Sequence, residues 1–198
     1  MPERESQPDE EWVSELKAEQ LMQEREQQEI QDKIMKDEAT GLFNLKGLME
    51  FGSRLIAERS REHLPVSVVV LDLDNLKKLN ERFGHPKVNE LLKAFGNHLT
   101  KIVREYDVVS RYGGDEFVVV FNAPKEKAGK LLAQPVSVEI NGEKIELSFT
   151  AGAVDVDFDH GPDMKLDAKK KLQDAIETAD QILMKSKKEN KGTVQMIN

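Results

Sequence analysis

The chain has 198 residues, of which 29 are Lys or Arg and 37 are Asp or Glu, for a formal net charge of −8. It contains no cysteine, which excludes disulfide bonds and thiolate chemistry. The acidic excess lies in residues 1–38, whereas residues 39–198 hold 24 acidic and 24 basic residues. A body without a basic excess is not expected to bind nucleic acid, and the lack of a long apolar run predicts a cytoplasmic protein without a membrane segment.

Residues 1–36 are expected to form an N-terminal helical extension, separate from a domain at residues 37–198. Residues 10–36 contain no Gly or Pro and favour a helix. One heptad frame has apolar residues at both ends of its seam and glutamine in the middle: Val13, Leu16, Gln20, Gln23, Gln27, Ile30 and Ile34. This pattern is typical of a weak coiled coil that would support a homodimer, and equally of a solvated helix that packs on its own domain.

The remainder of the chain alternates between helical and strand patterns. Asn44 is expected to cap a helix that runs to about Arg59, and Gly84 with Pro86 should end a short helix before a longer one begins. Further strands are expected at 66–72, 108–109, 118–121, 136–140, 144–150 with a continuation to 156, and 193–197, and further helices at 88–104, 124–132 and 166–188. This order predicts an α/β fold of the α+β sandwich type, in which helices flank one central, mostly antiparallel sheet.

The segment between the strands at 108–109 and 118–121 carries candidate site residues. Gly113-Gly114 predicts a tight hairpin turn, because glycine alone takes positive φ without strain. Asp115 and Glu116 would then stand at the tip of the hairpin. An ordinary solvated turn is the alternative interpretation of such a string.

A second acidic segment follows the apolar strand at 66–72, which ends in the alternating acids Asp72 and Asp74. Residues two apart on a strand share one face. Paired carboxylates suit a hard cation such as Mg²⁺ that carries phosphate oxygens. A two-carboxylate metal site is therefore predicted if this strand and the hairpin are neighbours.

Residues 111–117 match the signature that names the GGDEF domain of diguanylate cyclases. Other motifs of that family occur in order: Asp37 to Asn44, Asp72 to Asn80, Phe83 to His85, Ala179-Asp180 and Lys187. Residues 37–198 thus resemble this family, which implies the palm-like fold of nucleotidyl cyclases. The implied reaction joins two GTP molecules into cyclic di-GMP and releases pyrophosphate. Each domain would bind one GTP, so a homodimer is also implied.

The resemblance assigns roles at a metal centre. Asp72 and Asp115 match the metal ligands, the Leu73 carbonyl matches a backbone ligand, and Glu116 is expected to support the metal. Asp115 also matches the residue with the role of general base. The implied cofactor is Mg²⁺, with Mn²⁺ as an alternative.

The resemblance also implies how GTP is bound. Asn80 and Asn89 match guanine-binding positions, and His85 matches a substrate contact, although it could equally structure its loop. Phosphate contacts are implied for Lys77, Lys187 and Lys191, together with the close backbone approach that Gly113 and Gly114 allow. For any single lysine the alternative is a solvated surface charge.

Arg104 and Asp107 are three residues apart, and five residues separate Asp107 from the hairpin glycines. The pair matches the family's product-inhibition site. Arginine offers a fork to phosphate or a guanine edge, and aspartate accepts from guanine N–H groups. An ion pair at a helix end is the alternative interpretation of this spacing.

The sequence departs from the family pattern at several positions. Leu45 stands where arginine is usual, Val88-Asn89 replaces Gly-Asp, and the segment after the hairpin is short. Two other functions therefore stay open beside the active cyclase. One is a degenerate domain that binds GTP or cyclic di-GMP and signals through partners; the other is a cyclase with relaxed base choice that makes mixed cyclic dinucleotides.

Overall fold

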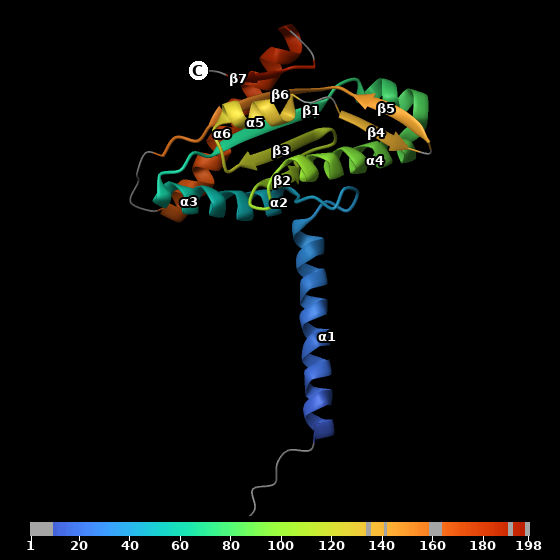
Figure 1. Ribbon diagram of the computed structural model, residues 1–198, viewed down its shortest axis with the longest axis vertical. Coiled ribbons are helices and arrows are strands. Elements are labelled where there is room, and N and C mark those ends of the chain that lie inside the picture. The colour runs from blue at the N-terminus through green and yellow to red at the C-terminus, as the bar shows by residue number, and fades with distance from the viewer. Residues whose placement is uncertain (1–9, 134–135, 141, 159–163, 190–191, 197–198) are drawn as a thin grey trace, which may run out of the picture. The chain divides into compact units, whose positions relative to one another are not determined.

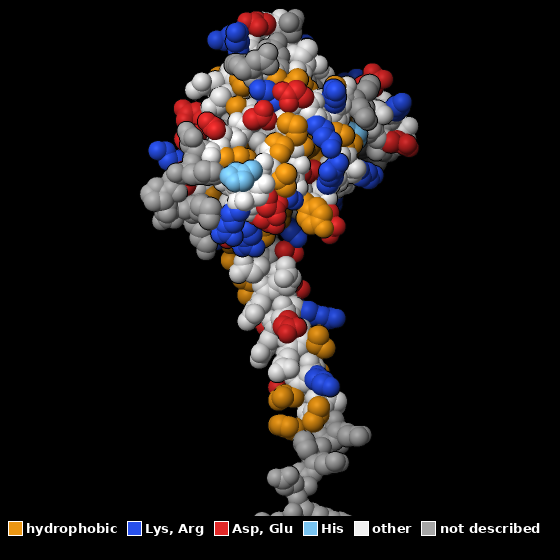
Figure 2. All heavy atoms as spheres, turned by 60° about the vertical axis from the view of Figure 1, so that its left-hand side comes forward, with side chains coloured by type: hydrophobic (Ala, Val, Ile, Leu, Met, Phe, Trp, Pro, Cys, Tyr) orange, Lys and Arg blue, Asp and Glu red, His pale blue; other side chains and the backbone are white. Residues whose placement is uncertain are grey.

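The computed structural model describes residues 10–133, 136–140, 142–158, 164–189 and 192–196, and the chain divides into two units, residues 1–34 and 35–198. Helix α1 (Glu10–Met35) makes up the described part of the first unit, in agreement with the helix expected at 10–36. Apolar and charged side chains lie together on the face of α1 that Figure 2 shows. The large apolar side chains exposed on this helix include Trp12, Leu16, Leu21, Met22 and Ile30. In the described part of the chain, no helix combines the length and apolar character needed to cross a bilayer.

Strand β1 (Ser67–Leu73) is the centre of the second unit, and all seven of its residues are buried. It lies within a five-stranded sheet of order β2-β3-β1-β6-β7, formed with β2 (Val108–Arg111), β3 (Glu116–Phe121), β6 (Phe149–Asp155) and β7 (Val194–Met196). Neighbouring strands are antiparallel except β6 and β7, which are parallel. The prediction of a mostly antiparallel central sheet is confirmed.

Helices cover both faces of this sheet, as Figure 1 shows. Alternate residues of a strand face opposite sides, and β1 accordingly supplies two cores. Val69 and Leu71 pack with α4 (Leu76–Ile102) and α5 (Lys125–Leu132). Val68 and Val70 pack with α6 (Met164–Glu189) and with a helical segment made of α2 (Leu45–Gly47), the π-helical turn η1 (Leu48–Gly52) and α3 (Ser53–Glu62). The expected α+β sandwich is confirmed.

The predicted helix boundaries at Asn44 and Gly84 are also present. The side chain of Asn44 accepts a hydrogen bond from the N–H of Gly47 at 3.0 Å, which is the contact of an N-cap. Gly84 has φ 78° and ψ 161°, so it interrupts α4 between a short first part and a long second part. The positive φ explains why glycine suits this position.

The strand expected at 144–150, with its continuation to 156, is wrong as a single element. Residues 143–147 form β5, which pairs with β4 (Val136–Ile140) in a separate two-stranded sheet, whereas β6 pairs with β1. The division falls at Ser148. Its carbonyl accepts from the N–H of Asp74 at 2.8 Å, and its hydroxyl donates to the Asp74 carboxylate at 2.8 Å. These bonds replace the ladder contacts that a continuous strand would make.

Candidate functional site

The two acidic segments predicted from the sequence lie side by side. In the ladder between β1 and β3, Asp72 is opposite Glu116, and the N–H of Leu73 donates to the carbonyl of Asp115 at 3.2 Å. The strands are therefore neighbours, as a shared metal site requires. Lys187 reaches the same place from α6, with its Nζ 2.6 Å from Oδ2 of Asp72.

Negative charge accumulates where these strands meet. Burial raises the pKa of Asp72, and the Asp115 carboxylate adds to the rise, while the hydrogen bond from Lys187 opposes it. Burial also raises the pKa of Glu116, with further contributions from the carboxylates of Asp72, Asp180 and Asp115. Carboxylates that raise one another's pKa are stabilised by a cation placed among them.

The donors present fit a divalent cation that is carried largely by its substrate. Among the residues that the structure describes, no three His, Cys, Asp or Glu side chains form a metal-binding group of their own. Mg²⁺, however, usually keeps several waters and binds one or two protein carboxylates together with substrate phosphates. Asp72, Asp115 and the Leu73 carbonyl match that partial set, and the ammonium of Lys187 already places a cation beside Asp72.

Asp74 has a different role from Asp72. Asp74 lies one residue beyond the end of β1, and its N–H donates to the carbonyl of Ser148 at 2.8 Å. Its buried carboxylate accepts hydrogen bonds from the hydroxyls of Ser148 at 2.8 Å and Thr150 at 3.0 Å. Asp74 thus joins the end of β1 to the start of β6 and leaves Asp72 as the strand's site residue.

The glycine turn forms for a reason other than the predicted one. Positive φ occurs at four described glycines, Gly41, Gly84, Gly142 and Gly192, and not at Gly113 or Gly114. A Cβ at Gly113 would lie 2.7 Å from Oε2 of Glu116, the end of a flexible side chain that would have to shift, and a Cβ at Gly114 would meet nothing within 4 Å. The N–H groups of Tyr112 and Gly113 both donate to the Glu116 carbonyl, at 2.8 Å and 3.3 Å, and close the turn.

The expected guanine-binding residues flank the break in α4. Asn80 precedes Gly84, and its buried Oδ1 has no hydrogen-bond partner among the residues that the structure describes. Asn89 follows the break and is exposed, as is His85. Val88, which replaces the glycine usual in the family, is 2% exposed and belongs to the core beneath α4.

The remaining expected phosphate contacts are Lys77 and Lys191. Lys77 is exposed in the first turn of α4, close in sequence to the end of β1. Lys191 lies outside the described residues.

The residues expected to bind product lie at the end of α4. Asp107 accepts from the backbone N–H of Arg104 and from that of Asn122, each at 2.8 Å, so its carboxylate organises the turn before β2. The side chain of Arg104 is exposed. Both residues line a cavity of about 240 Å³ whose wall also includes Lys36 and Phe43.

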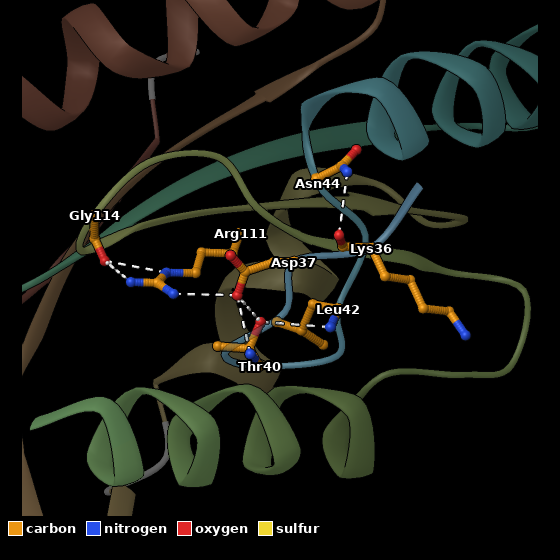
Figure 3. A network of polar contacts seen from close by, with 7 residues as sticks. All are labelled: Lys36, Asp37, Thr40, Leu42, Asn44, Arg111 and Gly114. Carbon is orange, nitrogen blue, oxygen red and sulfur yellow. Dashed lines mark hydrogen bonds and ion pairs between the residues drawn. The ribbon is translucent and has the colours of Figure 1, made fainter. Parts of the chain in front are cut away.

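A polar network that the sequence reasoning did not identify links residues 36–44 to the hairpin (Figure 3). Arg111 donates to the carbonyl of Gly114 from Nε at 3.1 Å and from Nη2 at 2.7 Å, and to Oδ1 of Asp37 from Nη1 at 3.1 Å. The same Oδ1 accepts from the N–H and hydroxyl of Thr40. Phe43 runs beside β2, since its N–H donates to the Val109 carbonyl at 3.3 Å and its carbonyl accepts from the N–H of Arg111 at 2.9 Å. Asp37 and Arg111 both lie within motifs quoted above, but a sequence does not show which charges meet.

The family model described as diguanylate cyclase, GGDEF domain, matches residues 34–193. Diguanylate cyclase DgcS of Shewanella oneidensis is 38% identical over 117 residues, which cover 59% of this chain and 40% of the relative. Diguanylate cyclase DosC of Escherichia coli is 30% identical over 168 residues, or 81% of this chain and 34% of the relative. The chain therefore spans less than half the length of these curated relatives.

Solved structures share the fold. The coiled coil and GGDEF domain of DgcB from Caulobacter crescentus, in complex with c-di-GMP, has a TM-score of 0.76 at 18% identity and covers 96% of this chain and 100% of that one. Diguanylate cyclase SiaD of Pseudomonas aeruginosa, in complex with its activator SiaC, has a TM-score of 0.67 at 22% identity, with 94% and 74% covered. With the sequence match, the acidic strand pair and this shared architecture together, the chain belongs to the GGDEF domain family of diguanylate cyclases.

Proposed function

We propose that this chain is the catalytic domain of a diguanylate cyclase, which condenses two GTP molecules into cyclic di-GMP and releases pyrophosphate. The observation that carries the proposal is the meeting of Asp72, on β1, with Asp115 and Glu116 on the hairpin, beside the ammonium of Lys187. The cyclase names of the curated relatives support the same activity.

The acidic pair would hold Mg²⁺, or Mn²⁺ in its place, through Asp72, Asp115 and the Leu73 carbonyl, with Glu116 in support. When bound, the metal stabilises the charge that develops on the reacting phosphate. Asp115 takes the proton from the 3′-hydroxyl of one GTP. The new bond joins that oxygen to the α-phosphorus of the second GTP, and the bond to pyrophosphate breaks. Lys77, Lys187 and Lys191 would bind the phosphates, close to the turn formed by Gly113 and Gly114.

One domain supplies half of the reaction, so two copies of the chain must meet face to face. We infer that α1 promotes this homodimer, because apolar side chains lie exposed along it and a tether raises the effective concentration of the second half-site. The solved DgcB structure, which includes a coiled coil with the GGDEF domain, supports the inference.

The cavity beside Arg104 and Asp107 supports inhibition by the product. The exposed guanidinium of Arg104 would bind phosphate or a guanine edge of cyclic di-GMP. Because no second arginine for this site is evident in the sequence, we expect weaker inhibition than is usual in the family.

Base choice is a second question, which Asn89 raises. A carboxylate at this position would accept from both N1–H and the N2 amino group of guanine, whereas an asparagine accepts only one and can pair with both edge groups of adenine. We therefore infer a cyclase that prefers GTP, with relaxed discrimination against ATP. Asn80, with its buried acceptor, favours guanine.

The test is to incubate the protein with GTP, with ATP and with both, in Mg²⁺, and to identify the products by mass. Cyclic di-GMP should form from GTP alone and be lost in Asp115→Ala, which removes a metal ligand and the base together. Wild-type turnover in a folded Asp115→Ala protein would refute the site. Binding of GTP or cyclic di-GMP without turnover by the wild type would favour the degenerate domain.

A further inference from the structure

We propose that Arg111 is a positioning residue for Asp115, and that Asp37, in the segment that follows α1, holds Arg111 in place. The proposal rests on the proposed function, in which Asp115 is a metal ligand and the base. It adds an assignment for two residues that touch neither metal nor substrate, and it begins from the contacts drawn in Figure 3.

The guanidinium of Arg111 uses all three of its nitrogens. Nε and Nη2 form a fork on the carbonyl of Gly114, at 3.1 Å and 2.7 Å, and Nη1 binds Asp37 at 3.1 Å. The side chain of Arg111 is only 13% exposed; its bond to Asp37 is partly buried, whereas its two bonds to Gly114 are exposed. A planar fork of this kind fixes direction as well as distance.

The Gly114 carbonyl belongs to the peptide that precedes Asp115. Because a trans peptide is planar, holding its carbonyl also fixes the direction of the Asp115 N–H. The peptide that follows Asp115 is held too, since its carbonyl accepts from the N–H of Leu73 at 3.2 Å. With both flanking peptides fixed, the Cα–Cβ bond of Asp115 has one direction. Leu73, on β1 beside Asp72, holds the peptide after Asp115, and Arg111, on β2, holds the peptide before it.

Asp37 completes the arrangement. Its Oδ1 accepts from Arg111 and from the N–H and hydroxyl of Thr40, at 2.9 Å and 2.7 Å. Although burial acts to raise it, the bonds from Thr40 and Arg111 hold the pKa of Asp37 below its ordinary value. Asp37 is thus ionised and held in one orientation. The backbone just before it is held as well, because the carbonyl of Lys36 accepts a hydrogen bond from the Asn44 side chain at 3.2 Å.

Lysine cannot replace Arg111 in this role. An ammonium would keep a charge opposite Asp37, but it is a single point and cannot form the fork on Gly114 while also reaching Asp37. Arg111→Lys therefore separates the positioning role from the ion pair. Partners that orient a metal ligand typically change metal affinity or activity about 10–100-fold when they are lost.

The experiment compares the wild type, Arg111→Lys, Asp37→Asn and Arg54→Lys. The last is a matched control, because Arg54 forms a surface ion pair with Glu50 at 3.2 Å and lies outside the site. Mn²⁺ affinity is measured by electron paramagnetic resonance with a non-reactive GTP analogue bound, alongside kcat, KM for GTP and Tm.

We expect Arg111→Lys to lower Mn²⁺ affinity and kcat by about tenfold or more, with a smaller change in KM. Asp37→Asn should change both quantities in the same direction and by less, and Arg54→Lys should match the wild type. The proposal is overturned if Arg111→Lys keeps wild-type Mn²⁺ affinity, if it loses only thermal stability, or if Arg54→Lys loses as much.

Should Arg111→Lys fail to fold, the same Mn²⁺ titration on Asp37→Asn decides the matter, because the loss of its charge should loosen Arg111 and weaken the metal. A wild-type protein that forms no cyclic product would refute the proposed function instead. The Mn²⁺ comparison would still decide whether Arg111 positions Asp115.

Discussion

Lys187 binds Asp72, so its ammonium would compete with the proposed metal. Lys187→Met removes the charge and keeps an unbranched apolar side chain. We expect this change to strengthen metal binding in the absence of nucleotide and to weaken GTP binding. Opposite signs are expected because Lys187 would have to leave Asp72 for a metal to bind and would then contact phosphate under the proposed function.

The size of both effects follows from the contact. Nζ of Lys187 lies 2.6 Å from Oδ2 of Asp72, and the two side chains are 33% and 10% exposed. A hydrogen bond to a charged group contributes roughly 1.5–3 kcal/mol, and the partial exposure of Lys187 places this one near the lower end. Metal affinity should therefore rise about tenfold, since about 1.4 kcal/mol corresponds to that factor. The lost phosphate contact is of the same kind, so GTP affinity should fall by about tenfold as well.

Two titrations test this prediction at about pH 8. The first measures Mn²⁺ affinity without nucleotide, and the second measures binding of a non-reactive GTP analogue at saturating metal. Lys188→Met is the matched control, because it removes an exposed lysine from the next position of α6. The reasoning is refuted if Lys187→Met weakens both ligands, or if Lys188→Met gives the same pattern.

Four other predictions concern stability, base choice, inhibition and assembly. Because burial and nearby carboxylates raise the pKa of Glu116, its ionised form destabilises the metal-free fold, and Glu116→Gln should raise Tm by about 2–4 °C at neutral pH. The gain in Tm should shrink as pH falls through the raised pKa, where Glu116 becomes protonated. Melting curves in which Glu116→Gln has the wild-type Tm at neutral pH would contradict this prediction. Asn89→Asp should tighten GTP binding about tenfold and reduce mixed products made with ATP present, and equal product ratios in both proteins would exclude a guanine contact there. Arg104→Ala should weaken cyclic di-GMP binding in calorimetry without changing GTP binding, whereas equal product affinities would remove the inhibition site. Deleting residues 10–34 should reduce specific activity most at low protein concentration, and a dilution series with unchanged rates would argue against α1 as the dimerising element.

The acidic strand pair could be predicted from the sequence because its signals are local. A run of apolar β-branched residues ending in Asp72 specifies a buried strand with a carboxylate at its end. The short segment around Gly113 specifies the hairpin. The same reasoning grouped Asp74 with Asp72 but could not show its partners, because the hydroxyls of Ser148 and Thr150, more than seventy residues away, hold its carboxylate.

Long-range contacts also explain the other differences between sequence and structure. The alternating pattern at 144–156 continues through Ser148, yet the chain changes sheets there, and both the carbonyl and the hydroxyl of Ser148 bond to Asp74. Val88 stands where the family has glycine, and the second part of α4 places its side chain in the core. The two hydrogen bonds from Arg111 to the Gly114 carbonyl depend on the backbone conformation of the turn, which the sequence alone does not reveal.

The path of Phe43 beside β2 also matters for how the domain is produced in isolation. Phe43 forms single β-bridges with Lys36 and Ser110, and it occupies the outer hydrogen-bonding groups of Val109 and Arg111. Without residues 35–44, β2 would become an open edge strand, which readily pairs with other chains. A recombinant domain that starts at Leu45 should therefore aggregate, whereas one that starts at Met35 should remain dispersed. Light scattering of the two purified proteins at equal concentration would distinguish these outcomes.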